Sequence, residues 1–173
     1  MEELHIISNP EEPHPLKKMF VSDTIAKLLK EKGFDEPCFA YYLLSYTTDE
    51  YKFYMVGERS QTGNIDWYTN YVGVGLTNAE MQRNPIGRLK QCFTAPIYSH
   101  VIKWFREKQG LDIQITNETL YSYCIKISAI QHDLRDGTFC LGKEYDSIRT
   151  QFTIEEEELA FSKAIEEALK YIG

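Results

Sequence analysis

The stretch Pro96–Thr116, PIYSHVIKWFREKQGLDIQIT, changes from a helical to a strand-like hydrophobic period. Pro96 suits the first turn of a helix, and apolar residues follow it at helical spacing, at Ile97, Val101, Ile102, Trp104 and Phe105. Gly110 ends this helix, and apolar and polar residues then alternate through 111–116, as in a half-buried strand. A helix that leads straight into such a strand predicts the α+β class, in which helices cover a sheet.

Two further amphipathic helices are marked at their ends. Ser22 is placed to cap a helix that Gly33 ends. Thr153 and Glu156 form a capping box for a helix that continues to Ile172, with apolar residues at helical spacing. Each helix has one apolar stripe and therefore needs a sheet face to cover.

The strands are expected in two groups. Residues 38–46 (CFAYYLLSY) are apolar and aromatic on both faces, which indicates a central strand, and 51–56 return from it as a hairpin. The second group follows Gly110, at 111–116, 121–129, 138–141 and 145–152, with a turn signal at Asp136-Gly137. The stretch 57–95 is punctuated by glycines and is the least legible, with strand-like aromatics in 65–74 and a short helix predicted over 77–83.

We therefore expect one α+β domain over residues 1–173. Its predicted core is an antiparallel or mixed sheet of five to seven strands packed with three main helices. Residues 1–19 are expected to form an extended N-terminal segment, because Pro10, Pro13 and Pro15 exclude a helix interior there.

Two segments of the chain echo each other. Residues 27–35 read KLLKEKGFD, and residues 103–112 read KWFREKQGLD, with one extra residue before the glycine. One interpretation is a duplicated helix–hairpin unit. The other is that amphipathic helices ending in glycine converge on such patterns.

Composition excludes several classes of protein. The formal net charge of −7 opposes non-specific binding to nucleic acid, which requires neutralisation of phosphates. The chain lacks a signal-peptide pattern and an apolar run of the roughly 20 residues that a membrane helix needs, so we expect a cytoplasmic protein without membrane contact. The four cysteines have no metal-like spacing and apolar or aromatic neighbours, so we expect packed thiols and neither metal nor other cofactor.

Positive charge is concentrated in residues 81–110, where six cations face Glu107 alone. A solvated helix face and an anion-binding or partner-docking patch are the two explanations. On the second, the candidate ligand site combines these cations and one histidine with nearby tyrosines, namely Arg83, Arg88, Lys90, His100, Lys103, Arg106, Tyr42 and Tyr54. No catalytic residue is assigned, because no known catalytic spacing occurs.

Three blocks together resemble a protein family. They are 25–42 (IAKLLKEKGFDEPCFAYY), 94–115 (TAPIYSHVIKWFREKQGLDIQI) and 154–172 (IEEEELAFSKAIEEALKYI). Their order resembles proteins of gut Bacteroidetes, such as Bacteroides, and of their phages or prophages. The chain departs from that pattern at Phe105, where leucine is usual, and over 57–93. The resemblance implies a phage or mobile-element accessory protein in the cytoplasm of a bacterial host cell, and it supplies no catalytic residues.

Three functions follow as hypotheses. The first is a non-enzymatic binding module for a host protein or a small anionic ligand, since a confined basic patch occurs without catalytic spacing. The second is a structural protein whose aromatic strands form a homo-oligomer interface. The third is a small enzyme acting on nucleotides or nucleic acid through groups near one helix, His100, Lys103, Arg106 and Tyr98.

Overall fold

A computed structural model describes residues 14–45, 48–57, 75–83, 91–119, 122–132, 139–150 and 157–172. The helices are η1 (Lys17–Met19), α1 (Asp23–Glu31), α2 (Asn78–Arg83), α4 (Tyr98–Trp104), η3 (Phe105–Gln109), α5 (Glu157–Ala168) and η5 (Leu169–Tyr171). The strands are β1 (Ala40–Leu44), β2 (Tyr51–Met55), β3 (Cys92–Thr94), β4 (Leu111–Thr119), β5 (Ser122–His132) and β6 (Phe139–Thr150). The expected aromatic strand at 65–74, the turn at 136–137 and the capping box at 153–156 lie outside the described residues.

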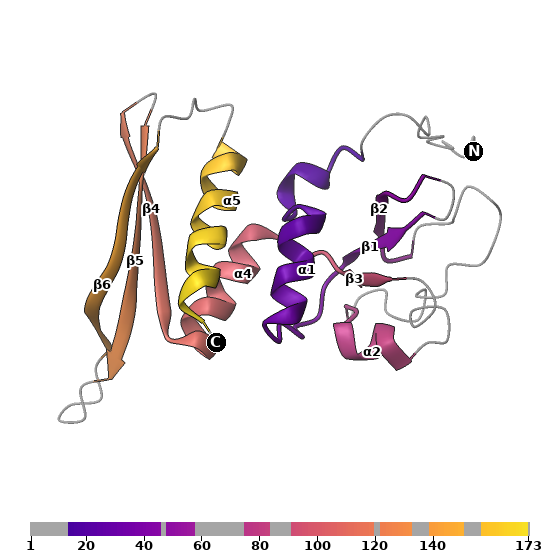
Figure 1. Cartoon of the computed structure of the whole chain (residues 1–173), viewed down its shortest axis with the longest axis horizontal. Coiled ribbons are helices and arrows are strands. Elements are labelled where there is room, and N and C mark those ends of the chain that lie inside the picture. Colours follow the sequence, from indigo (N-terminus) through magenta and orange to yellow (C-terminus); the bar gives the residue numbers. More distant parts are fainter. Residues whose placement is uncertain are drawn as a thin grey trace, which may run out of the picture.

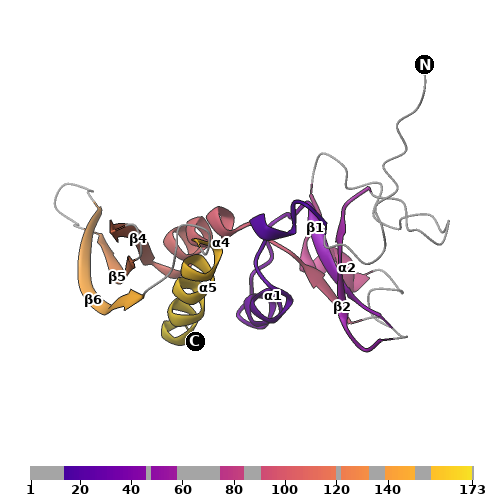
Figure 2. The same ribbon diagram turned by 90° about the horizontal axis from the view of Figure 1, so that it is seen from above.

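The α+β class is confirmed, but the single sheet of five to seven strands is wrong. Two three-stranded antiparallel sheets form instead, in the orders β2-β1-β3 and β4-β5-β6. Figures 1 and 2 show the reason, because the helices lie between the sheets: α4 and α5 line the β4-β5-β6 sheet and α1 lines the other. Each apolar helix stripe thus finds its own sheet, and the layers run sheet, helices, helix, sheet.

Two smaller expectations are also corrected. The N-terminal segment is not extended throughout, since η1 is a 3₁₀ turn within residues 1–19. The strands predicted at 138–141 and 145–152 are one strand, β6, whose pairing with β5 is interrupted by register shifts near Ser128. These β-bulges let a long strand bend without breaking.

The first sheet separates its aromatic residues by face. Tyr42, Phe53 and Phe93 pack into the main core, and the Tyr42 hydroxyl donates to the Val21 carbonyl oxygen at 2.7 Å. Tyr41 and Tyr54 occupy the other face, where they join a smaller cluster with Leu76 and with Met81 of α2. The sheet is therefore covered on both sides, which explains why residues 38–46 are apolar on both faces.

One hydrophobic cluster joins the two sheets. It contains buried residues of both sheets and of the helices between them, including Ile25, Leu29, Phe34, Tyr42, Trp104, Phe105, Ile125, Ile127 and Ile165. Phe34 and Trp104 meet with ring centroids 5.4 Å apart, and Trp104 and Phe105 with centroids 5.1 Å apart. The end of α1 is thereby packed against the end of α4.

The sequence echo has a structural counterpart at the ends of α1 and α4. Both helices run into a glycine with positive φ, Gly33 at 84° and Gly110 at 66°, followed by buried Phe34 or Leu111. The extra residue in the second copy is accommodated by η3, a π-helical turn in which the Gly110 N–H reaches the Phe105 carbonyl oxygen. The likeness stops at the sheets, because β1 is central in its sheet and β4 lies at an edge.

Two glycines with positive φ give a matched pair of stability tests. Gly33 has φ +84° and open space where a Cβ would stand, so Gly33→Ala should cost about 1 kcal/mol of strain. Gly75 has φ +80°, and a Cβ there would lie 2.7 Å from the Cβ of Pro37. Gly75→Ala should therefore lower the free energy of unfolding by at least about 1 kcal/mol more, measured by urea denaturation. Equal losses in the two variants would contradict the close approach to Pro37.

Candidate functional site

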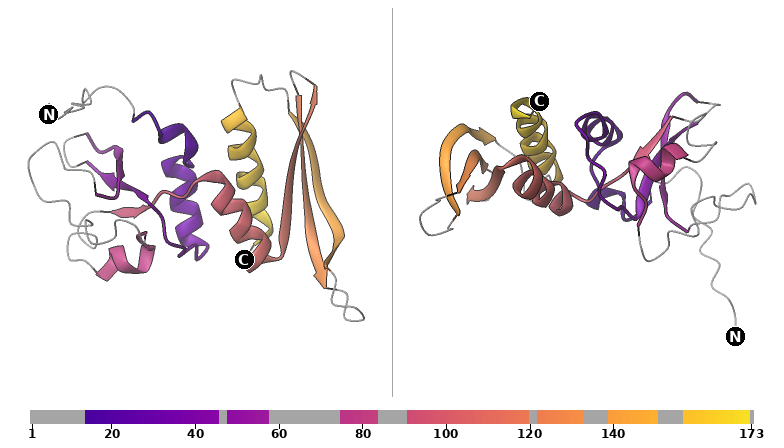
Figure 3. Two further views of the ribbon diagram at one scale, coloured as in Figure 1. Left: turned by 180° about the vertical axis from the view of Figure 1, so that it is seen from behind. Right: turned by 90° about the horizontal axis from the view of Figure 1, so that it is seen from below.

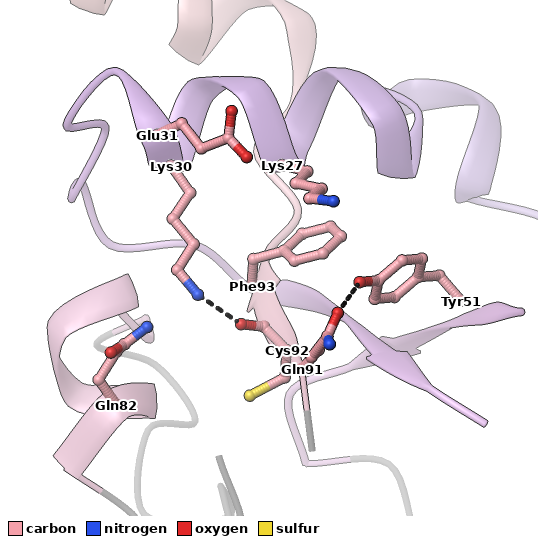
Figure 4. A pocket seen from close by; sticks show the side chains of 8 residues that line it. All are labelled: Lys27, Lys30, Glu31, Tyr51, Gln82, Gln91, Cys92 and Phe93. Atoms are coloured by element: carbon pink, nitrogen blue, oxygen red, sulfur yellow. Dashed lines mark hydrogen bonds between the residues drawn. The ribbon is translucent and has the colours of Figure 1, made fainter. Parts of the chain in front are cut away.

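An open cavity of about 410 Å³ lies between α1 and the edge of the first sheet. Figure 4 shows its lining, which comes from α1, β2, α2 and β3 with the residue before it, namely Lys27, Lys30, Glu31, Tyr51, Gln82, Gln91, Cys92 and Phe93. The volume falls within the roughly 300–1,000 Å³ range of small-molecule sites. We take it as the candidate functional site.

The amphipathic pattern of α1 presents these lysines to the cavity. Ile25, Ala26 and Leu29 are buried in the core, so the intervening polar residues lie on the opposite side of the helix. Ser22 starts the helix as predicted, its hydroxyl oxygen accepting from the Ile25 N–H at 3.3 Å. The lysine ammonium groups consequently lie over β3, which is an edge strand of its sheet (Figure 4).

Side chains cap the open edge of β3. The Lys30 ammonium donates to the Cys92 carbonyl oxygen at 3.0 Å. Buried Asn78 makes two bonds, accepting from the Thr94 N–H at 3.0 Å and donating to the Phe34 carbonyl oxygen at 2.8 Å. Because alternate residues of an edge strand direct their backbone groups outward, these two side chains satisfy groups that a neighbouring strand would otherwise use.

Aromatic rings form one wall of the cavity. The rings of Tyr51 and Phe93 have centroids 4.8 Å apart, and the Tyr51 hydroxyl donates to the Gln91 Oε1 at 3.0 Å. Burial, with smaller contributions from the carboxylates of Asp23 and Asp49, raises the pKa of the Tyr51 phenol above its ordinary value. The hydroxyl therefore stays protonated at neutral pH and remains a donor to Gln91. The amide nitrogen of Gln91 is left as a donor for a ligand.

The cavity is positive by one charge. Two lysines and Glu31 line it, and Lys30 has already engaged a backbone carbonyl. Lys27 is exposed, and no hydrogen bond or ion pair holds its ammonium group within the described part of the chain. Figure 4 shows Lys27 beside the Phe93 ring, with the Tyr51 hydroxyl and Gln91 nearby. An acceptor-rich anion would find a free cation and an amide donor there.

The predicted site residues do not assemble in this way. Arg83 is exposed at the end of α2, whereas His100 and Lys103 lie on α4 and Arg106 on η3. Figures 1 and 3 show α2 and α4 on opposite sides of α1. Arg88 and Lys90 lie outside the described residues.

The two predicted tyrosines are also separated. Tyr42 is 1% exposed, with its hydroxyl bound to a backbone carbonyl, so its contribution is to the core. Tyr54 stacks on Tyr41 at 5.6 Å on the other face of the sheet. Neither side chain lines the cavity described above.

Much of the charge around η3 is paired. The Arg106 Nε donates to Asp112 Oδ1 at 2.8 Å, its Nη2 bonds the same oxygen, and Gln114 donates to Asp112 Oδ2 at 2.8 Å. Lys103 and Glu107 form an exposed pair at 3.8 Å. Burial, and then the nearby Lys103, lowers the pKa of His100, whose ring packs edge-on against Phe34. These contacts favour the solvated-face explanation of the cation cluster.

The cysteine side chains that the structure describes lie in the interior. Cys38, Cys92 and Cys124 are buried and form no disulfide. Burial raises the pKa of the Cys38 thiol to about 12, which keeps it protonated. Within the described part of the chain, no group of three or more His, Cys, Asp or Glu side chains is placed to hold a metal ion.

No family model, curated protein or solved structure matches the chain. The resemblance to proteins of gut Bacteroidetes and their phages therefore stays a prediction. Among the described helices, none is both long and apolar enough to cross a membrane.

The sequence did not single out the cavity residues, although one signal was available. Lys27 and Lys30 are three residues apart on the polar face of a helix whose ends were both predicted. What could not be anticipated was β3, a strand of three residues inside the least legible stretch. Because no strand was predicted at β3, the sequence did not show that Gln91 and Phe93 lie beside α1.

The edge caps lead to a stability prediction. Asn78→Ala leaves the buried Thr94 N–H and Phe34 carbonyl without their side-chain partner, so the free energy of unfolding should fall by about 1–3 kcal/mol. Arg83→Ala, at an exposed position on the same helix, should change it by less than about 0.5 kcal/mol. Thermal and urea denaturation of the two variants measure the difference. Similar values would show that Asn78 does not hold α2 to β3.

Proposed function

We propose that the chain is a non-enzymatic binding module that holds a small anionic ligand in the cavity between α1 and β3. The observation that carries the proposal is the exposed ammonium group of Lys27, which has no partner among the described residues, at a cavity whose wall is aromatic. A lysine in this position supplies charge, and the rings supply an apolar surface.

The ligand chemistry follows from the donors. Lys27 offers three N–H donors, Lys30 retains two after its bond to the Cys92 carbonyl, and the Gln91 amide offers its nitrogen. Hydrogen-bond donors therefore dominate the mouth of the cavity, with Glu31 as the opposing carboxylate. A singly charged, acceptor-rich group such as a carboxylate suits this balance better than a polyphosphate does.

Two of the four groups named for the enzyme hypothesis have partners of their own. It invoked Lys103 and Arg106 beside His100, but Arg106 is bound to Asp112 and Lys103 is paired with Glu107. Engagement of a host protein and the mobile-element setting stay predictions from the sequence. We expect a bound anion to lie in the cavity between α1 and β3.

Binding can be tested by ¹⁵N–¹H NMR titration with benzoate, acetate and inorganic phosphate. We expect benzoate to shift the amide resonances of Lys27, Lys30, Gln91 and Phe93, because its ring adds contact with the aromatic wall. Lys27→Met should weaken benzoate binding about tenfold, the loss expected for one charge-assisted hydrogen bond of roughly 1.5 kcal/mol or more.

Lys103→Met provides the matched control. It removes an exposed cation of the same kind from α4, away from the cavity, and should leave the benzoate affinity unchanged. Shifts that gather around α4 and η3, or a Lys27→Met variant that binds as well as the native protein, would refute the assignment of the cavity.

A further inference from the structure

β4 is an edge strand of the second sheet, and half of its backbone N–H and C=O groups point outward, away from β5. The Ile130 N–H donates to the Gly110 carbonyl at 2.7 Å, and the register pairs Asp112 with Ser128 and Gln114 with Lys126. Hydrogen-bonded pairs alternate in an antiparallel ladder, so the even-numbered residues of β4 bond to β5. The N–H and C=O groups of Leu111, Ile113, Ile115 and Asn117 consequently point away from the sheet.

Within the described residues, this edge is open from Leu111 to Asn117. Figure 3, in the view from behind, shows β4 at the front of its sheet with no described element drawn over it. Of the strands in the described residues, β5 alone pairs with β4, and within the same residues no backbone hydrogen bond reaches the outward groups of Ile113, Ile115 or Asn117. The register is regular from Leu111 to Asn117 and shifts only beyond it.

The contrast with β3 is informative. There, Lys30 and Asn78 cover the outward groups of a three-residue strand. On β4, the exposed side chains between Leu111 and Asn117 are the uncharged Gln114, Thr116 and Asn117. The one charged residue of this run, Asp112, is buried and bound to Arg106. Proteins guard free edges with charges, proline, bulges or a covering element, so this run, which ends before the register shift, is suited to pairing.

We propose that β4 pairs antiparallel with β4 of a second copy of this chain, forming one continuous six-stranded sheet. The outward groups belong to odd-numbered residues, so the pairing must join odd residues to odd residues. A two-fold axis at Gln114 satisfies this rule, with Leu111 opposite Asn117 and Ile113 opposite Ile115 of the other copy. The two-fold repeat of these pairs gives about eight N–H to C=O bonds, within the roughly 10 ± 5 of a typical protein interface.

The regular part of the strand selects this register. The run from Leu111 to Asn117 is centred on Gln114, so an axis there uses all four outward residues, whereas an axis at Ile115 would pair Leu111 with Thr119, beyond the register shift. With the axis at Gln114, Asp112 faces Thr116 and the two Gln114 residues face each other. The half-buried Ile115 then lies beside Ile113 of the other copy on the helix-covered side of the sheet. The pairing is independent of the cavity, which lies on the other sheet.

The oligomeric state is the first test. Light scattering of the full chain at about 200 µM should give twice the mass of one 20.2 kDa chain. Asn117→Pro removes two of the about eight intermolecular bonds but no bond to β5, and should raise the dimer dissociation constant at least tenfold with an unchanged circular dichroism spectrum. A single-chain mass for the native protein at this concentration overturns the proposal.

Cross-linking tests the register. With Cys140 replaced by serine, the three other native cysteines are buried. Gln114→Cys puts two thiols face to face at a non-hydrogen-bonded pair, about 4.5 Å between Cα atoms, where a disulfide can close. Thr116→Cys, the matched control, puts its thiols about 13 Å apart along the strands. Mild oxidation should cross-link the first variant and not the second. Equal cross-linking of both, or of neither, overturns the assigned pairing.

Discussion

The contact among Phe34, Trp104 and Phe105 holds the two sheets of this protein to a common core. These three rings are nearly fully buried, and they meet where α1 and α4 end. Two of them are placed by a local feature of the chain: Phe34 by the left-handed turn at Gly33, and Phe105 by the start of the π-helical turn that precedes Gly110. Truncating a buried aromatic ring costs about 3–5 kcal/mol, comparable to a large share of a domain's stability, so the relative placement of the sheets depends on this cluster.

The candidate cavity depends on the same arrangement. Since Ile25 and Leu29 fix one side of α1 in the core, Lys27 and Lys30 are held on the side that overlooks β3. Lys30 and Asn78 then complete the edge of β3 from two different helices, which ties α1 and α2 to one short strand. A binding site built on helices and strands retains its geometry better than one built on loops. The cost is that one of the two lysines is occupied by the backbone, leaving Lys27 as the group that can respond to a ligand.

The main helices, the hairpin of β1 and β2, and the strands β4 and β5 could be predicted from the sequence, because their signals are local. Ser22, Gly33 and Gly110 act where capping chemistry places them, and the alternation in 111–116 continues into β4. The division into two sheets could not be predicted, since it depends on which face each helix covers. The surroundings of the predicted site residues could not be predicted for a related reason. Nearness in sequence does not show that Arg106 reaches Asp112 across the turn at Gly110, or that Tyr42 and Tyr54 face opposite ways. Charge counted along a chain is not charge available at a surface.

Dividing the six described strands between two sheets has a further consequence, because these strands then have four sheet edges where one sheet would have two. Every edge strand has backbone N–H and C=O groups that form no hydrogen bond within the sheet. At β3 the partners are side chains of the same chain, and the space beneath them is the candidate cavity. At β4 the described residues provide no such partners along a regular run from Leu111 to Asn117. Both inferred activities, ligand binding and self-association, thus arise from how the fold treats its edges, and the helices that separate the sheets are what create those edges.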